Sequence, residues 1–178
     1  MTYSATDRIL FQAVDTGRLI QRHPLGGSGS IRKLFVTPTI KAILDGQDDK
    51  FKHMPLVETE KIIGCFCNGH FVTASLKGNP NPKPDFERLE GLDEVWAICA
   101  RKPKMSQIRI FGRFISKGTF VAFGLHERVT LGLRENYNAK ASEVPGLWNE
   151  VLGDCVPHEA SSVEEYFGGV CRDVDDEI

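Results

Sequence analysis

The sequence lacks the features that direct a chain into or across a membrane. A membrane-spanning helix needs about 20 consecutive apolar residues, and no apolar run here approaches that length. The first ten residues, MTYSATDRIL, have no basic region followed by an apolar stretch, which a secretory signal peptide requires. We therefore expect a cytoplasmic protein with no membrane partner.

The number of cysteines is odd. The five cysteines match no disulfide framework, so we expect reduced thiols. The set Cys65-x-Cys67-x-x-His70 supplies three ligands where structural zinc takes four, and on a helix the two thiols would point to different faces. We interpret these cysteines as small buried residues. The sequence thus predicts neither a metal nor another cofactor, and the glycine-serine run 26–30 lacks the lysine of a phosphate-binding loop.

An excess of charge of one sign is also lacking, since the formal net charge is only -2. The charges are nevertheless segregated along the chain. Residues 101–128 hold seven basic side chains and one acid, a local charge of +6, whereas residues 135–178 hold eleven acids and two bases, a local charge of -9. Such asymmetry suggests an anionic partner for the basic segment. It also suggests that the acidic tail covers the basic surface, the alternative being a solvated tail.

The clearest strand signals lie in the middle of the chain. Residues 94–100, 107–115 and 119–125 are apolar or alternating, and Ser116-Lys117-Gly118 between the last two is typical of a hairpin turn. In the second run, Ile108, Ile110 and Phe114 alternate with Arg109 and Arg113. Short links between consecutive strands predict an antiparallel meander with one polar, solvated face.

Helices are predicted on both sides of these strands. Capping residues and apolar spacing place them at residues 6–21, from Thr37-Pro38 to Gly46, at 59–68, at 142–152, and from Ser161 or Ser162 onward. Three prolines make residues 77–85 a loop, and the charged end DVDDEI is expected to fray.

These elements predict one α+β domain over residues 1–178. Its sheet is a small antiparallel meander with helices on one face. Residues 1–55 form an N-terminal helical extension, residues 56–130 the core, and residues 131–178 an acidic helical C-terminal segment.

Three runs carry a resemblance to a known family. FERLEGLDEVWAI, IRIFGRF and GTFVAFGLHER resemble the core strands of the RelE/ParE-like toxin superfamily and its phage-derived relatives, over roughly residues 59–130. The matched positions are 92–98, 108–110 and 121–128. Ala97 stands where the family has an acid, Ile108 where it has a tyrosine, and Glu127-Arg128 where it has paired lysines.

The resemblance implies a RelE-like core and a metal-independent endoribonuclease of a type II toxin-antitoxin system. Such an enzyme cleaves mRNA, with the ribosome as a further partner and a cognate antitoxin as its inhibitor, and a homodimer is left open. Cations stabilise the phosphate while a proton moves from the attacking 2′-hydroxyl. The catalytic candidates are Arg101, Lys104, Arg109, His126 and Arg128, and the RNA-binding candidates are Lys102, Arg113 and Lys117.

Three other interpretations stay open. The chain could be a phage-derived binding module that keeps the fold without the chemistry, or, as in the ParE branch, an inhibitor of a topoisomerase. The arginines of the second strand could also be no more than the solvated face of a half-exposed sheet.

In the ribonuclease hypothesis, His126 is the proposed proton shuttle because an unperturbed imidazole titrates near neutrality.

Overall fold

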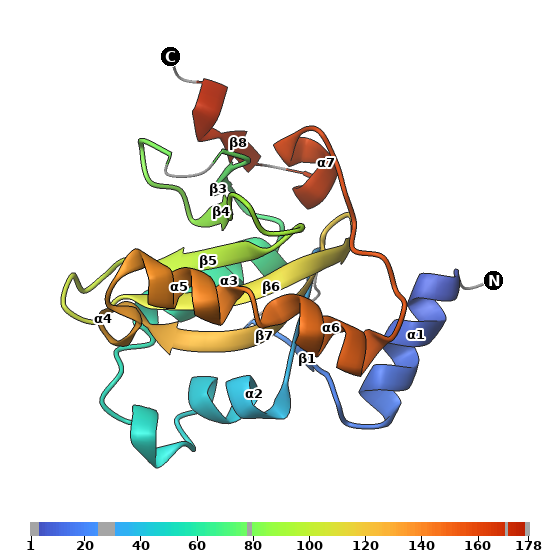
Figure 1. Ribbon diagram of the computed structural model, residues 1–178, viewed down its shortest axis with the longest axis horizontal. Helices are drawn as coiled ribbons and strands as arrows, with labels where there is room; N and C mark the ends of the chain where they lie inside the picture. Colours follow the sequence, from blue (N-terminus) through green and yellow to red (C-terminus); the bar gives the residue numbers. More distant parts are fainter. Residues whose placement is uncertain (1–3, 25–30, 78–79, 170, 177–178) are drawn as a thin grey trace.

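The computed structural model describes residues 4–24, 31–77, 80–169 and 171–176, so the glycine-serine run 26–30 lies outside the described residues. The chain folds around one sheet of eight strands in the order β1-β2-β7-β6-β5-β4-β3-β8 (Figure 1). The strands are β1 (Ile20–Arg22), β2 (Lys33–Val36), β3 (Val72–Ser75), β4 (Phe86–Arg88), β5 (Trp96–Ala100), β6 (Ile108–Ser116), β7 (Thr119–Glu127) and β8 (Cys171–Asp173).

The predicted meander is confirmed at the centre of this sheet. β5, β6 and β7 pair consecutively and antiparallel, and Ser116 pairs with Thr119 across the predicted hairpin turn. Gly118 supplies the positive φ of 70° that the turn requires. The prediction of a small, purely antiparallel sheet is wrong, because β2 pairs parallel with β7, and β3 pairs parallel with both β4 and β8.

The N-terminal segment is part of this sheet. The helix predicted for residues 6–21 ends early: Gly17, with φ 71°, follows α1 (Ala5–Asp15), and the chain then enters β1. Ser4 and Asp7 form the capping box that starts α1. Residues 1–55 are therefore more than a helical extension, since β1 and β2 extend the sheet beside β7.

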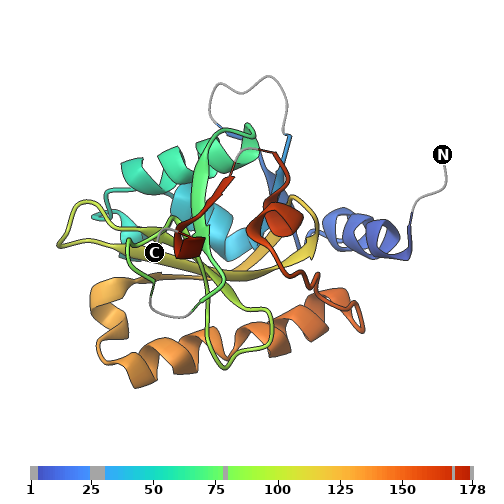
Figure 2. The same ribbon diagram turned by 90° about the horizontal axis from the view of Figure 1, so that it is seen from above.

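Helices cover both faces of the sheet, which corrects the prediction of one covered face. Figure 2 shows α4, α5 and α6 along one face, and α2 and α3 on the other. The helices that follow α1 are α2 (Pro38–Leu44), α3 (Val57–Cys67), α4 (Arg128–Leu131), α5 (Arg134–Ala141), α6 (Val144–Leu152) and α7 (Val163–Phe167), with 3-10 turns η1 (Asp49–Phe51) and η2 (Val174–Asp176). Thr37 caps α2, and Ser162 with Glu165 forms the capping box of α7, both as predicted.

Two hydrophobic cores hold these layers together. The first joins the sheet to α2, α3 and α7, and contains Trp96 edge-to-face with Phe114 at a centroid distance of 5.4 Å. The second joins the sheet to α1, α5 and α6 around Trp148, which is fully buried. Both faces of β6 are consequently buried, so Ile108 and Arg109, which point to opposite faces, are both buried.

Residues 171–176 of the acidic C-terminal segment are built into the sheet as well, contrary to the fraying expected there, and residues 177–178 lie outside the described residues. β8 pairs with β3, and Val174 is buried. The Asp175 carboxylate accepts hydrogen bonds from the Ser75 hydroxyl at 2.9 Å and from the backbone N–H groups of Leu76 and Lys77 at 3.1 Å. These hydrogen bonds to an ionised carboxylate hold the C-terminal segment against the sheet.

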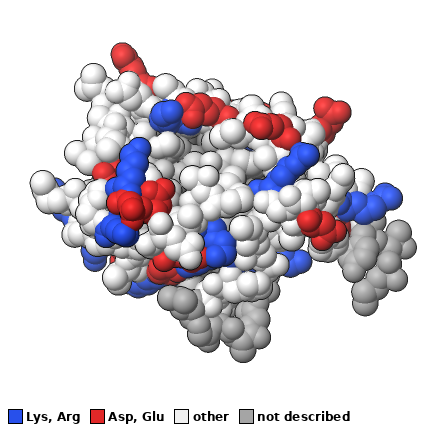
Figure 3. Space-filling view, turned by 90° about the horizontal axis from the view of Figure 1, so that it is seen from below, with Lys and Arg blue, Asp and Glu red and all other residues white. Residues whose placement is uncertain are grey.

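Two surface observations complete the fold. No helix in the described parts of the chain is long and apolar enough to cross a bilayer. On the side of the molecule near α2, basic and acidic side chains lie next to one another (Figure 3). The ion pairs of α2 and of the turn η1 include Lys41–Asp45 and Lys52–Asp49.

Substituting two glycines by alanine should change the stability of the protein in opposite directions. A Cβ on Gly112 of β6 would lie 2.1 Å from the Val121 carbonyl oxygen, whereas one on Gly64 of α3 would meet no atom within 4 Å. We expect Gly112→Ala to lower the free energy of unfolding by about 3 kcal/mol or more. Gly64→Ala should raise it by about 0.5–1 kcal/mol, because alanine loses less backbone entropy in a helix. Urea unfolding of both variants measures the difference, and a well-folded Gly112→Ala protein would contradict the packing described for β6 and β7.

The C-terminal carboxylate gives a second stability prediction. Asp175→Ala removes an acceptor that three donors share. The Ser75 hydroxyl and the Lys77 N–H keep a second partner, whereas the Leu76 N–H loses its acceptor, so the free energy of unfolding should fall by about 1–3 kcal/mol. Asp154→Ala is the matched control, since Asp154 is exposed in the loop after α6. Equal stabilities of the two variants in thermal or urea unfolding would show that the tail is not held by this carboxylate.

Candidate functional site

A pocket of about 500 Å³ lies on the face of the sheet covered by α5, where β5 ends and β6 begins. Its walls come from the loop before β4, from β4, from the ends of β5 to β7, and from α5. It is lined by Lys83, Glu87, Leu89, Glu90, Arg101, Gln107, Arg109, Arg128, Tyr137 and Asn138. Three of the five predicted catalytic residues therefore meet in one pocket.

Arg101 lies just beyond the end of β5. Its guanidinium donates to the Cys99 carbonyl at 3.2 Å and to the Pro84 carbonyl. It also lies 3.5 Å from the Glu87 carboxylate, which β4 holds opposite Ala97 of β5. This ion pair places the Arg101 cation at the junction of β4 and β5, with a quarter of its side chain (24%) exposed.

Arg109 forms the inner wall of the pocket. It was predicted to be exposed, but α5 covers this face of β6 and only 7% of Arg109 is accessible. Its guanidinium donates to the Ile108 carbonyl at 2.9 Å, to the Ala100 carbonyl at 3.3 Å and to the Gln107 side chain at 3.3 Å. Neutral acceptors hold the group in place, so its charge remains available to an anion in the pocket.

Arg128 and Tyr137 close the pocket from the side of the helices. The Arg128 guanidinium donates to the Gly132 carbonyl at 2.8 Å and stands over the Tyr137 ring, 5.5 Å from its centroid. Burial raises the pKa of Tyr137 well above its ordinary value of 10.0, so its phenol stays protonated at neutral pH. The sequence prediction missed Tyr137 because residues 131–178 were predicted to be helical without a helix placed at residues 134–141. The one available signal was an aromatic residue in the polar segment RENYNAKA.

Two carboxylates share the pocket with these cations. Glu87 is paired with Arg101 as described, and Glu90 follows Leu89 in the turn after β4. Both were outside the predicted site, although the run FERLEG that holds them had been singled out for its resemblance. The site is therefore mixed in charge, with guanidinium groups and a lysine facing two acids.

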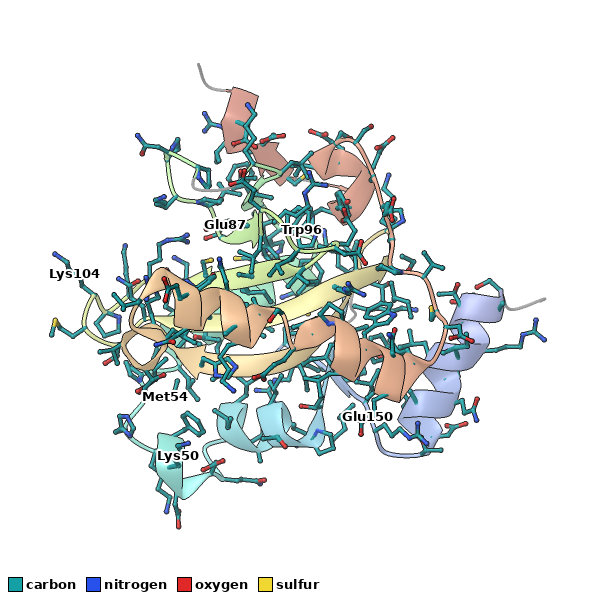
Figure 4. All side chains as sticks on the ribbon, in the orientation of Figure 1. Lys50, Met54, Glu87, Trp96, Lys104 and Glu150 are labelled. Carbon is teal, nitrogen blue, oxygen red and sulfur yellow. The ribbon has the colours of Figure 1, made fainter. Side chains whose placement is uncertain are left out.

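The other predicted residues lie elsewhere. Lys102 and Lys104 are exposed on the loop between β5 and β6, and Figure 4 shows Lys104 at the outer tip of this loop, away from Glu87. Lys117 is in the hairpin turn at the opposite end of β6. Arg113 is 3% exposed, pairs with Asp93 at 2.9 Å and stacks on Trp148, so it is a buried structural residue rather than an RNA contact.

His126 is also outside the pocket. Its ring packs against Phe111 at a centroid distance of 5.7 Å and lines a separate, smaller hollow beside Lys140. Burial and the nearby Lys140 lower the pKa of His126, which keeps the imidazole neutral. His126 is paired with Arg109 across β6 and β7, but it does not line the pocket that Arg109 lines.

The described part of residues 161–178 does not cover the site, whereas α5, which lies at the start of the acidic segment, lines it. α7 packs in the first core, on the face of the sheet opposite the pocket, and no described residue of the tail lines the pocket. The expected masking of the basic surface by residues 161–178 is thus wrong for the part of the tail that the structure describes.

Nothing in the described residues indicates a metal centre. No group of three or more His, Cys, Asp or Glu side chains there could hold an ion. Cys67 is buried, with a pKa raised to about 11 by that burial, and all five cysteines are free.

Comparisons with protein families, with curated proteins and with solved structures gave no significant match for this chain.

Tyr137 gives a pH prediction for the site. Because its folded pKa lies above 10.0, the folded protein binds the phenolic proton more tightly than the unfolded chain does. This contribution to stability is complete below the unfolded pKa and is lost as the pH rises through the folded pKa. Above pH 10 the free energy of unfolding should fall more steeply for the natural protein than for Tyr137→Phe. Parallel curves for the two proteins would contradict the burial of this phenol.

Proposed function

We propose that this chain is a toxin-like endoribonuclease that holds an RNA phosphate in the pocket formed by Arg101, Arg109 and Arg128. The observation that carries the proposal is that three guanidinium groups, from the residue after β5, from β6 and from the start of α4, line one pocket. Planar guanidinium groups bind phosphate oxygens through paired hydrogen bonds. The resemblance to RelE/ParE-like toxins supplies RNA as the substrate class, mRNA at the ribosome as the target, and an antitoxin as the natural inhibitor.

The proposed reaction needs no metal. The 2′-hydroxyl oxygen attacks the adjacent phosphorus, the 5′-oxygen of the next nucleotide leaves, and a cyclic phosphate remains. Arg101 and Arg109 stabilise the charge that develops on the phosphate oxygens. Since His126 lies outside the pocket, the Glu87 carboxylate is the proposed acceptor of the 2′-hydroxyl proton, and water protonates the leaving oxygen.

One observation favours a second candidate, RNA binding without cleavage. The Tyr137 phenol and the Glu87 carboxylate are two candidate proton-transfer groups that line the pocket. Burial keeps the phenol protonated, and an ion pair already engages Glu87. A pocket of this kind could bind phosphate and leave it intact.

Cleavage and binding assays separate these two functions. We expect Arg101→Ala and Arg109→Ala each to lower the RNA cleavage rate by about tenfold or more, because each removes a cation that binds the transition state preferentially. Each should also reduce the slope of log affinity against log salt by about 0.7 for single-stranded RNA. Arg109→Lys keeps the positive charge but loses the paired N–H donors of the planar guanidinium. This variant should therefore bind RNA and cleave it poorly.

Arg8→Ala is the matched control, since Arg8 is an exposed arginine on α1 far along the chain from the pocket. Gln107→Ala cannot serve as a control, because Gln107 accepts a hydrogen bond from Arg109. Binding without cleavage in the natural protein would favour the second candidate. Unchanged RNA affinity and salt slope in folded Arg101→Ala and Arg109→Ala proteins would remove the pocket from any RNA function.

A further inference from the structure

The acids of the pocket have no role in holding phosphate, yet one of them faces the same space as the arginines. We propose that Glu90 reads the base of the bound nucleotide and selects guanine. This inference rests on the proposed function, since it assumes that Arg101 and Arg109 hold a phosphate of RNA.

The two acids differ in what already engages them. Glu87 lies 3.5 Å from the Arg101 guanidinium, which partly neutralises its charge. Glu90 is exposed, and among the described residues its carboxylate has no hydrogen bond or ion pair. Both of its oxygens are therefore free to accept hydrogen bonds from a ligand in the pocket.

The backbone on either side of Glu90 holds this residue at the pocket. Leu89 is 7% exposed and packs in the second core, so the chain is anchored immediately before Glu90. Gly91, with φ 76°, then turns the chain away. An anchored residue on one side and a turn on the other restrict where the Glu90 side chain can go, and it lines the pocket together with Arg101 and Arg109.

Among the four bases, guanine matches a free carboxylate best. Its Watson–Crick edge presents two adjacent donors, N1–H and the 2-amino group, which can donate in parallel to the two carboxylate oxygens. Adenine and cytosine each offer one exocyclic amine, beside a ring nitrogen that repels a carboxylate. Uracil offers a single N–H between two carbonyls, which repel it on both sides. The exposed Asn138 amide on α5 lines the same pocket and can donate to the guanine O6.

The size of the pocket suits one nucleotide. Its volume of about 500 Å³ lies within the range of small-ligand sites. The pocket is lined by cations and by a free carboxylate, which suit the two unlike ends of a nucleotide monophosphate, the phosphate and the base.

The test compares RNA oligomers of about 12 nucleotides, a length within the range of single-strand binding sites. Each is oligouridylate with one central guanosine, adenosine or cytidine, and unsubstituted oligouridylate is the reference. Affinity is measured by fluorescence anisotropy at fixed salt. We expect the guanosine oligomer to bind about tenfold more tightly than the others, as one bidentate contact to a base allows.

Glu90→Gln should abolish this preference, so that the guanosine oligomer binds no more tightly than oligouridylate, because an amide offers only one acceptor. Glu135→Gln is the control, since Glu135 is an exposed acid on α5 outside the pocket. Equal affinity for all four oligomers, or a guanosine preference that survives in Glu90→Gln, would overturn the inference and leave the phosphate site standing. No affinity for any oligomer would instead overturn the proposed function itself.

Discussion

The burial of both faces of the β6–β7 hairpin is the constraint on which the rest of the structure depends. Each strand has nine residues, and α3 with α7 covers one face while α5 with α6 covers the other. β6 alternates apolar residues with Arg109 and Arg113, so these two cations are carried into the interior. A buried guanidinium is tolerated only where acceptors or an opposite charge surround it.

The two buried arginines meet this requirement in different ways. Arg113 has an acid, Asp93, and an aromatic surface, Trp148, so its charge is used within the fold. Arg109 has the carbonyls of Ile108 and Ala100 and the Gln107 side chain, all of which are neutral. Only Arg109 therefore offers uncompensated charge to the pocket, which explains why one of two similar arginines belongs to the candidate site.

Basic and acidic residues are segregated along the sequence, but they are not segregated in the folded structure. The acidic C-terminal segment splits between two faces: α6 lies on the pocket side, and α7 lies in the opposite core. One of its carboxylates, Asp175, is bound by the β3 end of the sheet. The acids that do face the basic pocket, Glu87 and Glu90, come instead from the middle of the chain.

The sequence by itself determined the β5–β6–β7 meander, the start of α2 at Thr37 and the capping box of α7, because alternation and capping are local signals. It also brought Arg101, Arg109 and Arg128 into one candidate site through the short links of the meander. Only the tertiary structure decided the parallel pairings of β2, β3 and β8, since strands of three or four residues carry no readable period. The burial of Arg109, the exclusion of His126 and the entry of Glu87, Glu90 and Tyr137 were likewise decided by the packing of α5 and β4 on β5 to β7, contacts between segments that no local pattern connects.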